Sequence, residues 1–358
     1  MPHASPEAKG SNPTAGLTLL WAGNPFRGNF NHWQASRKET GQIFFKRQCG
    51  CGKGITIYIC NWNIRGLGEK EEELDKILNE NNIKVSVLTY SKKKLQGTKQ
   101  TEHYTVIYSG VDRHTRGQSG IIIGIHKSIS NNVDHYKFWN DKVIETRLNT
   151  QRGQLTITGV YAPTEGSYKL NEEFYETLQK ILDEVNKNDY IMLTGVMNAR
   201  VGNNRVSNIV GTNGEATLNS NGRNLIDFCT FNYLKIMNTF FKHKEIHKFT
   251  WEARGCKSII DYFITNTKTS KLTQNIRVYR SNEMGSDHYL SCAKVNFPPL
   301  CLNKSNKKTP LKQDEFFKVR LLNDESTRWL YTQRVKLHLS NTKMKQTLRK
   351  NGKTYKTF

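Results

Sequence analysis

Short apolar segments, separated by polar or glycine positions, recur through the middle of the chain. The segment 55–59 (ITIYI) is the first of them, and its β-branched and aromatic residues are typical of strands. The pattern therefore predicts a region rich in β-strands, about ten in number. The expected strands lie at 55–59, 85–88, 103–109, 120–126, 143–148, 155–162, 190–195, 233–238, 258–265, 276–279 and 288–295.

Three segments show helical spacing of apolar residues instead. In 69–82, Leu74, Ile77 and Leu78 lie on one face, and acidic residues at the start favour a helix N-terminus. Longer amphipathic patterns cover 168–187 and 219–233. So many strands with so few helices predict the α/β (α+β) class, with two packed, mostly antiparallel β-sheets flanked by helices.

Composition divides the chain into three segments. Residues 1–53 show no sustained periodicity, and we expect them to be disordered or loosely packed. Residues 54–298 contain the predicted strands and form the expected globular domain. Residues 299–358 are basic and polar, with one short amphipathic helix expected near 326–339.

Positive charge is concentrated in the two flanks. The formal net charge is +23, of which residues 1–53 carry +5, residues 54–298 carry +7 and residues 299–358 carry +11. A nearly balanced domain with basic flanks suggests attraction to a polyanion such as DNA. Lysine-rich solvated linkers are the alternative interpretation, and charge alone does not separate the two.

Apolar runs and cysteine usage exclude several protein classes. No apolar run approaches the roughly 20 residues of a membrane helix, so no membrane association is expected. The opening MPHASPEAKG has no apolar core of a signal peptide, and the seven cysteines are an odd number. We therefore expect a nuclear or cytoplasmic protein with reduced thiols that is not secreted.

Polar residues recur at the ends of the predicted strands. Strand ends on a rigid scaffold can converge on one rim, where functional sites form. Each residue alone also has a structural explanation, such as an asparagine that stabilises a turn. The candidates are Asn63, Tyr161, Asn198, Asp261, Asp287 and His288.

The order of the motifs around these residues is more specific than any single one. WNIRGL, GVYAPTEG, LTGVMNARVG, SIIDYFIT and GSDHYL follow one another between residues 54 and 298, and this order resembles the endonuclease/exonuclease/phosphatase superfamily. SKKKLQGTKQTEHYTVIYSGV and NSNGRNLIDFC further resemble the endonuclease domain of RTE-type LINE retrotransposons and a domesticated relative of it. LLNDESTRWLYTQRV resembles the segment that leads toward a reverse transcriptase in such elements, and we interpret the chain as a truncated or domesticated copy.

The resemblance implies a DNase I-like sandwich that cleaves DNA with Mg²⁺. Such a reaction needs a metal and hydrogen-bond donors, because negative charge concentrates on the phosphate oxygens in the transition state. By analogy, Asn63 would help place metal and phosphate, Tyr161 and Asn198 would bind the scissile group, and Asp261 would support the site. The pair Asp287–His288 would present an imidazole to the phosphate. Arg65 and Arg200 are candidate phosphate clamps for DNA.

Two departures from the family pattern predict impaired catalysis. Tyr90 stands where the family has its metal-binding Glu, and Val196 stands where it has its catalytic Asp. Mg²⁺ prefers carboxylate oxygens, so Asp287, with Asp261, is the weak metal candidate that is left. The hypotheses are an impaired DNA-nicking endonuclease, a DNA-binding pseudonuclease and, third, a phosphatase of the same superfamily.

Overall fold

The computed structural model describes residues 54–300, the backbone of two earlier strands and three later positions. The early strands, β1 (Trp33–Arg37) and β2 (Ile43–Arg47), pair antiparallel. Glu325, Arg328 and Thr332 are helical and exposed. The chain separates into two units, Met1–Gly52 and Lys53–Phe358. Apart from these positions, the predictions for 1–53 and 301–358, including the extent of the helix near 326–339, concern residues outside the described part of the chain.

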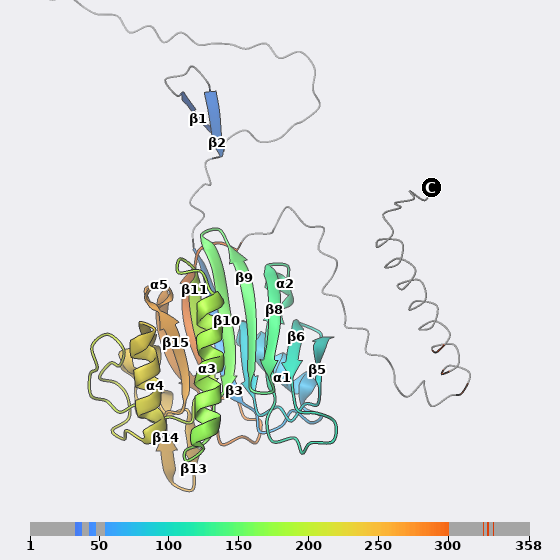
Figure 1. Ribbon diagram of the computed structural model, residues 1–358, viewed down its shortest axis with the longest axis vertical. Coiled ribbons are helices and arrows are strands. Elements are labelled where there is room, and N and C mark those ends of the chain that lie inside the picture. Colours follow the sequence, from blue (N-terminus) through green and yellow to red (C-terminus); the bar gives the residue numbers. More distant parts are fainter. Residues whose placement is uncertain are drawn as a thin grey trace, which may run out of the picture. The chain divides into compact units, whose positions relative to one another are not determined.

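Two mixed β-sheets form the centre of the second unit (Figure 1). The seven-stranded sheet has the order β16-β17-β3-β4-β7-β6-β5, and the six-stranded sheet has the order β12-β15-β11-β10-β9-β8. Within the described sheets, only β3–β4 and β10–β11 pair in parallel. The strands of the first sheet are β3 (Ile55–Asn63), β4 (Ile83–Thr89), β5 (Gln96–Gln100), β6 (Tyr104–Ser109), β7 (Ile121–His126), β16 (Thr273–Tyr279) and β17 (Leu290–Phe297). Those of the second are β8 (Val133–Asn140), β9 (Val143–Thr150), β10 (Gly153–Tyr161), β11 (Tyr190–Val196), β12 (Leu234–Ile236) and β15 (Asp261–Asn266).

Helices and short elements complete the domain. Figure 1 shows α3 (Tyr168–Glu184) and α4 (Ser220–Phe231) side by side over the six-stranded sheet. Their alignment follows from ring contact between Tyr175 and Phe228 and from the Asn171 amide, which donates to Asn221. The remaining elements are α1 (Glu71–Glu80), α2 (Lys127–Ser130), α5 (Thr267–Ser270), the 3₁₀ turns Met237–Phe240 and Glu245–His247, and the hairpin β13 (Trp251–Ala253) with β14 (Cys256–Ser258).

Apolar side chains fill the space between the sheets and beneath the helices. The central core joins Val87 and Ile123 of one sheet with Ile157 and Phe263 of the other. A second cluster lies between the six-stranded sheet and α3 with α4, and a third lies between the seven-stranded sheet and α1. The result is a four-layer sandwich in which α3 with α4 covers the outer face of one sheet and α1 covers that of the other, as the apolar faces of the strands require.

The predicted fold class is therefore confirmed, with local corrections. The strand expected at 233–238 ends at Ile236 and continues as a 3₁₀ turn, and the strand expected at 258–265 begins only at Asp261. The prediction missed β5 and β8, which lie at the sheet edges. Edge strands are half-exposed, so their sequences, such as QGTKQ, lack the apolar pattern. Among the described residues, no helix combines the length and apolar character needed to cross a membrane.

Candidate active site

Tyr161, Val196 and Asp261 occupy one row across three adjacent strands. Tyr161 pairs with Val196, and Val196 pairs with Asp261, so their side chains share the face that looks toward the other sheet. Gly195 makes this row possible: its φ is +142°, and a Cβ atom there would lie 2.0 Å from the Val160 carbonyl oxygen. Only glycine accommodates both the backbone angle and the close approach of β10.

His288 lies at the centre of a buried hydrogen-bond chain. Its Nδ1 is 2.9 Å from Oδ2 and 3.2 Å from Oδ1 of Asp261. Its Nε2 is 3.3 Å from Nδ2 of Asn63. Because an amide nitrogen can only donate and a carboxylate only accept, the network assigns the proton to Nδ1, with Nε2 as acceptor. All three side chains are at least 93% buried.

The loop before β17 is fastened to the end of β3. The indole of Trp62 donates to the backbone carbonyl of His288 at 2.9 Å. The Ser286 hydroxyl donates to the Asn63 carbonyl at 2.6 Å and accepts from the His288 amide at 3.1 Å. These contacts fix the imidazole relative to Asn63, so the chain of hydrogen bonds joins the two sheets.

Asp287 faces the rim and is already paired with a cation. Its Oδ2 lies 3.2 Å from the Arg65 guanidinium and accepts from the Trp251 indole at 3.1 Å. The Asp287 side chain is 24% exposed and that of Arg65 is 56% exposed. The arginine therefore lies at the surface beside the site and would compete with any metal for Asp287, while its role as a phosphate clamp stays a prediction.

Tyr90 follows β4 directly and contacts Tyr161 of the other sheet. Their ring centroids are 5.9 Å apart, with the planes tilted by 58°. Burial, and then the nearby Tyr90, Asp261 and Asp287, raise the pKa of Tyr161 to about 12, so its phenol is neutral at physiological pH. The pairing of Tyr161 with Val196, and of Val196 with Asp261, places the phenol at the same site.

Asn198 and Arg200 lie farther along the same loop and are engaged locally. Nδ2 of Asn198 donates to the Ala162 carbonyl at 2.7 Å, next to Tyr161. Arg200 lies beside the start of α4, and its charge acts on Glu165 and on the buried Glu215. Burial raises the pKa of Glu215. The described contacts therefore bring Asn198 beside the site, whereas those of Arg200 connect it to α4 instead.

The side chains at this site do not fit Mg²⁺. Val196 is 1% exposed and offers no oxygen. Both oxygens of Asp261 face the Nδ1–H of His288, and Asp287 is paired with Arg65. A phenol at Tyr90 is a poor substitute for a carboxylate, because Mg²⁺ prefers hard, charged oxygen ligands. The donor set is therefore incomplete for this ion.

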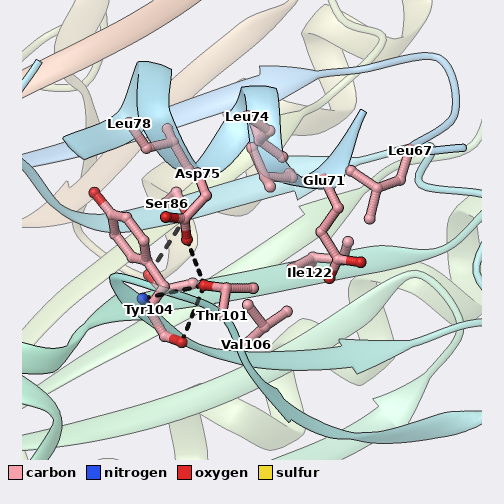
Figure 2. Close-up of a pocket in the computed structure, with 12 residues that line it drawn as sticks. Leu67, Glu71, Leu74, Asp75, Leu78, Ser86, Thr101, Tyr104, Val106 and Ile122 are labelled. Carbon is pink, nitrogen blue, oxygen red and sulfur yellow. Dashed lines mark hydrogen bonds between the residues drawn. The ribbon is translucent and has the colours of Figure 1, made fainter. Parts of the chain in front are cut away.

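An acidic cluster elsewhere was not anticipated from the sequence. Asp75 of α1 lies near Glu102 and His103, and the three could present ligand atoms within 4.8 Å of one another. Figure 2 shows Asp75 beside Thr101 and Tyr104, in a pocket between α1 and the sheet. Asp75 accepts from the Thr101 hydroxyl and contacts His103 Nδ1 at 2.5 Å. These contacts attach α1 to the β5–β6 turn, and no sequence motif links positions so far apart.

No family model matches the chain, but individual proteins do. Craniofacial development protein 2 of Tragulus javanicus is 30% identical over 258 residues, which is 70% of this chain and 44% of that protein. The Bos taurus protein of the same name is 29% identical over 266 residues, or 72% of this chain and 44% of that protein. The chain thus matches less than half the length of these curated relatives, and the domesticated relative expected from the motifs is among them.

Solved structures share the fold at low identity. The catalytic domain of Xenopus laevis APE2 superposes with a TM-score of 0.53 at 15% identity, over 69% of this chain and 94% of that one. The AP endonuclease LMAP from Leishmania major gives 0.54 at 12% identity, over 68% and 88%. The endonuclease domain of TRAS1, a telomere-specific non-LTR retrotransposon, gives 0.50 at 14% identity, over 68% and 99%. The domain therefore has the endonuclease/exonuclease/phosphatase fold, and its sequence resembles craniofacial development protein 2.

Proposed function

We propose that this domain binds DNA at its strand-end site and cleaves it poorly or not at all. The observation that carries the proposal is that one site keeps its hydrogen-bonded polar residues and lacks the carboxylates expected beside them. The chain Asn63–His288–Asp261 is complete and buried, whereas Val196 and Tyr90 replace the carboxylates that the family resemblance calls for.

Loss of the two carboxylates affects chemistry more than binding. A missing general base typically lowers the rate by about 10²–10⁴-fold, and loss of a metal ligand adds to this. A phosphate, in contrast, is bound by donors that remain, such as the exposed guanidinium of Arg65. The second candidate is a residual nicking activity, which would use the buried His288–Asp261 pair.

Charge supports DNA as the partner. The net charge is +23, and the last 60 residues carry +11 of it. If these flanks contribute to affinity, binding should weaken steeply as salt increases, because each phosphate contact releases counterions. Deleting residues 299–358 should lower both the affinity and the slope of its salt dependence. Affinity that is unchanged by both salt and deletion would contradict DNA binding through the flanks.

Nicking of supercoiled plasmid in Mg²⁺ tests the catalytic half of the proposal. The full chain is compared with the double reversion Tyr90→Glu/Val196→Asp and with the matched uncharged control Tyr90→Gln/Val196→Asn. We expect little or no nicking by the unaltered chain and the control, and a gain of at least 100-fold in the reversion. Efficient nicking by the unaltered chain that His288→Ala abolishes would refute impairment and establish the nicking endonuclease.

A further inference from the structure

We propose that Tyr90 and Tyr161 form a stacking site for one unpaired nucleobase, where the related enzymes are expected to place their metal carboxylate. This inference rests on the proposed DNA binding and names the form of DNA that the site selects. The two rings lie 5.9 Å apart, and both side chains are partly exposed at the rim. Aromatic rings at a nucleic-acid surface stack bases regardless of sequence, because every base has a π-face.

The backbone holds Tyr90 in a fixed position. Its φ is +54°, which a non-glycine residue adopts only where the surrounding structure enforces it. The next residue, Ser91, accepts from the Leu67 amide at 3.1 Å and donates to the Gly120 carbonyl at 3.0 Å. The Lys92 amide donates to the Ser119 carbonyl at 2.9 Å. Two neighbouring loops thus hold the backbone of this segment, so little backbone entropy is left to lose when a ligand binds to the ring.

Two cationic side chains lie on the Tyr90 side of this site. The ammonium group of the exposed Lys92 lies 5.3 Å from the centroid of the Tyr90 ring. Lys92 also lies against Gly66, next to the exposed Arg65. A nucleotide placed on Tyr90 would therefore have cations available for its phosphates. Apolar ligands would gain nothing from these cations, so the chemistry favours a nucleotide.

The site requires a base that is not paired. A base inside a duplex already has both faces stacked on its neighbours, so it reaches a protein ring only after leaving the stack, at a cost of a few kcal/mol. Single strands, gaps and bulges lack this cost. The site therefore predicts a preference for unpaired over fully paired DNA, which the basic flanks alone would not produce because they contact phosphates.

Fluorescence of 2-aminopurine tests the inference on the full chain. Three probes are compared: a single strand, a duplex with one unpaired 2-aminopurine, and the same duplex fully paired. We expect stacking to quench the unpaired base on binding. Tyr90→Ala should weaken binding of the two unpaired probes by about 5- to 100-fold and change binding of the paired duplex less than about 2-fold. Tyr90→Phe should keep both affinity and quenching.

Two further variants secure the interpretation. Tyr90→Leu keeps an apolar side chain without a ring face, so it should behave as Tyr90→Ala even if the smaller residue disturbs the loop. Tyr233→Ala removes a tyrosine that is 81% exposed on another part of the surface and should change nothing. Equal losses on paired and unpaired probes, or an unquenched base, would overturn the stacking site alone. Failure of the unaltered chain to bind any probe would overturn the proposed DNA binding as well.

Discussion

Replacing Val196 by aspartate should create a measurable repulsion with Asp261. Val196 is 1% exposed and pairs directly with Asp261 on the neighbouring antiparallel strand. Side chains that face each other in this way have Cβ atoms about 5 Å apart. At an effective dielectric constant of about 20, two unit charges at that separation repel by about 3 kcal/mol. His288, which donates to Asp261, reduces this, so about 3 kcal/mol is an upper limit.

The matched variant Val196→Asn separates charge from shape. Both substitutions remove the same apolar side chain and introduce a polar group of nearly equal size, so their difference reports the charge. Urea denaturation at pH 7 should show Val196→Asp less stable than Val196→Asn by about 2–3 kcal/mol. Lowering the pH toward 4 should shrink the difference, because the introduced carboxyl group is increasingly protonated there and loses its charge.

Magnesium extends the same experiment to the metal site. In Tyr90→Glu/Val196→Asp, 10 mM Mg²⁺ should restore about 2.7 kcal/mol if the rebuilt site binds with a dissociation constant near 0.1 mM. The unaltered chain should gain nothing comparable. Equal stability of Val196→Asp and Val196→Asn at pH 7 would show that positions 196 and 261 do not face each other.

Two other predictions concern stability and pH. Asp261→Asn should lower the free energy of unfolding by about 1–3 kcal/mol, because a buried donor of His288 loses its charged acceptor. Asp287→Asn, whose partner Arg65 is largely exposed, should cost less than about 1 kcal/mol in the same urea titration, and equal costs would contradict the burial described here. The raised pKa of Tyr161, about 12, stabilises the folded state fully below pH 10 and ceases to do so as pH rises toward 12. Tyr161→Phe should lack that component of alkaline unfolding, and identical unfolding profiles for the two proteins would refute it.

Much of the domain could be predicted because its strands are buried. Segments such as Ile121–His126 are continuous apolar runs, and their sequence alone indicates a buried strand. The edge strand Gln96–Gln100 could not be found in this way, since its side chains face solvent and its identity depends on pairing with β6. The start of β15 at Asp261 depends likewise on pairing with Val196.

The residues of the site could be predicted from the sequence, but the hydrogen bonds among them could not. Motif order selected Asn63, Asp261 and His288, yet the direction of each hydrogen bond depends on how β3, β15 and the loop before β17 meet. The contact between Tyr90 and Tyr161 could not be predicted either, because the two residues belong to different sheets. Sequence spacing carries no information about such an approach.

The surviving polar chain has a structural role that does not depend on catalysis. Asn63 belongs to the seven-stranded sheet and Asp261 to the six-stranded sheet, so His288 links the two at their ends. A second link lies nearby, where the Asn61 amide donates to the Thr194 hydroxyl at 2.7 Å. Removing any member would leave a buried polar group without its partner, at a cost of about 1–3 kcal/mol. A valine at position 196 in place of a carboxylate has no such cost, because valine leaves no polar group unpaired. Stability therefore opposes loss of the polar chain but not a valine at position 196. An intact His288–Asp261 pair is for this reason not by itself evidence of catalysis.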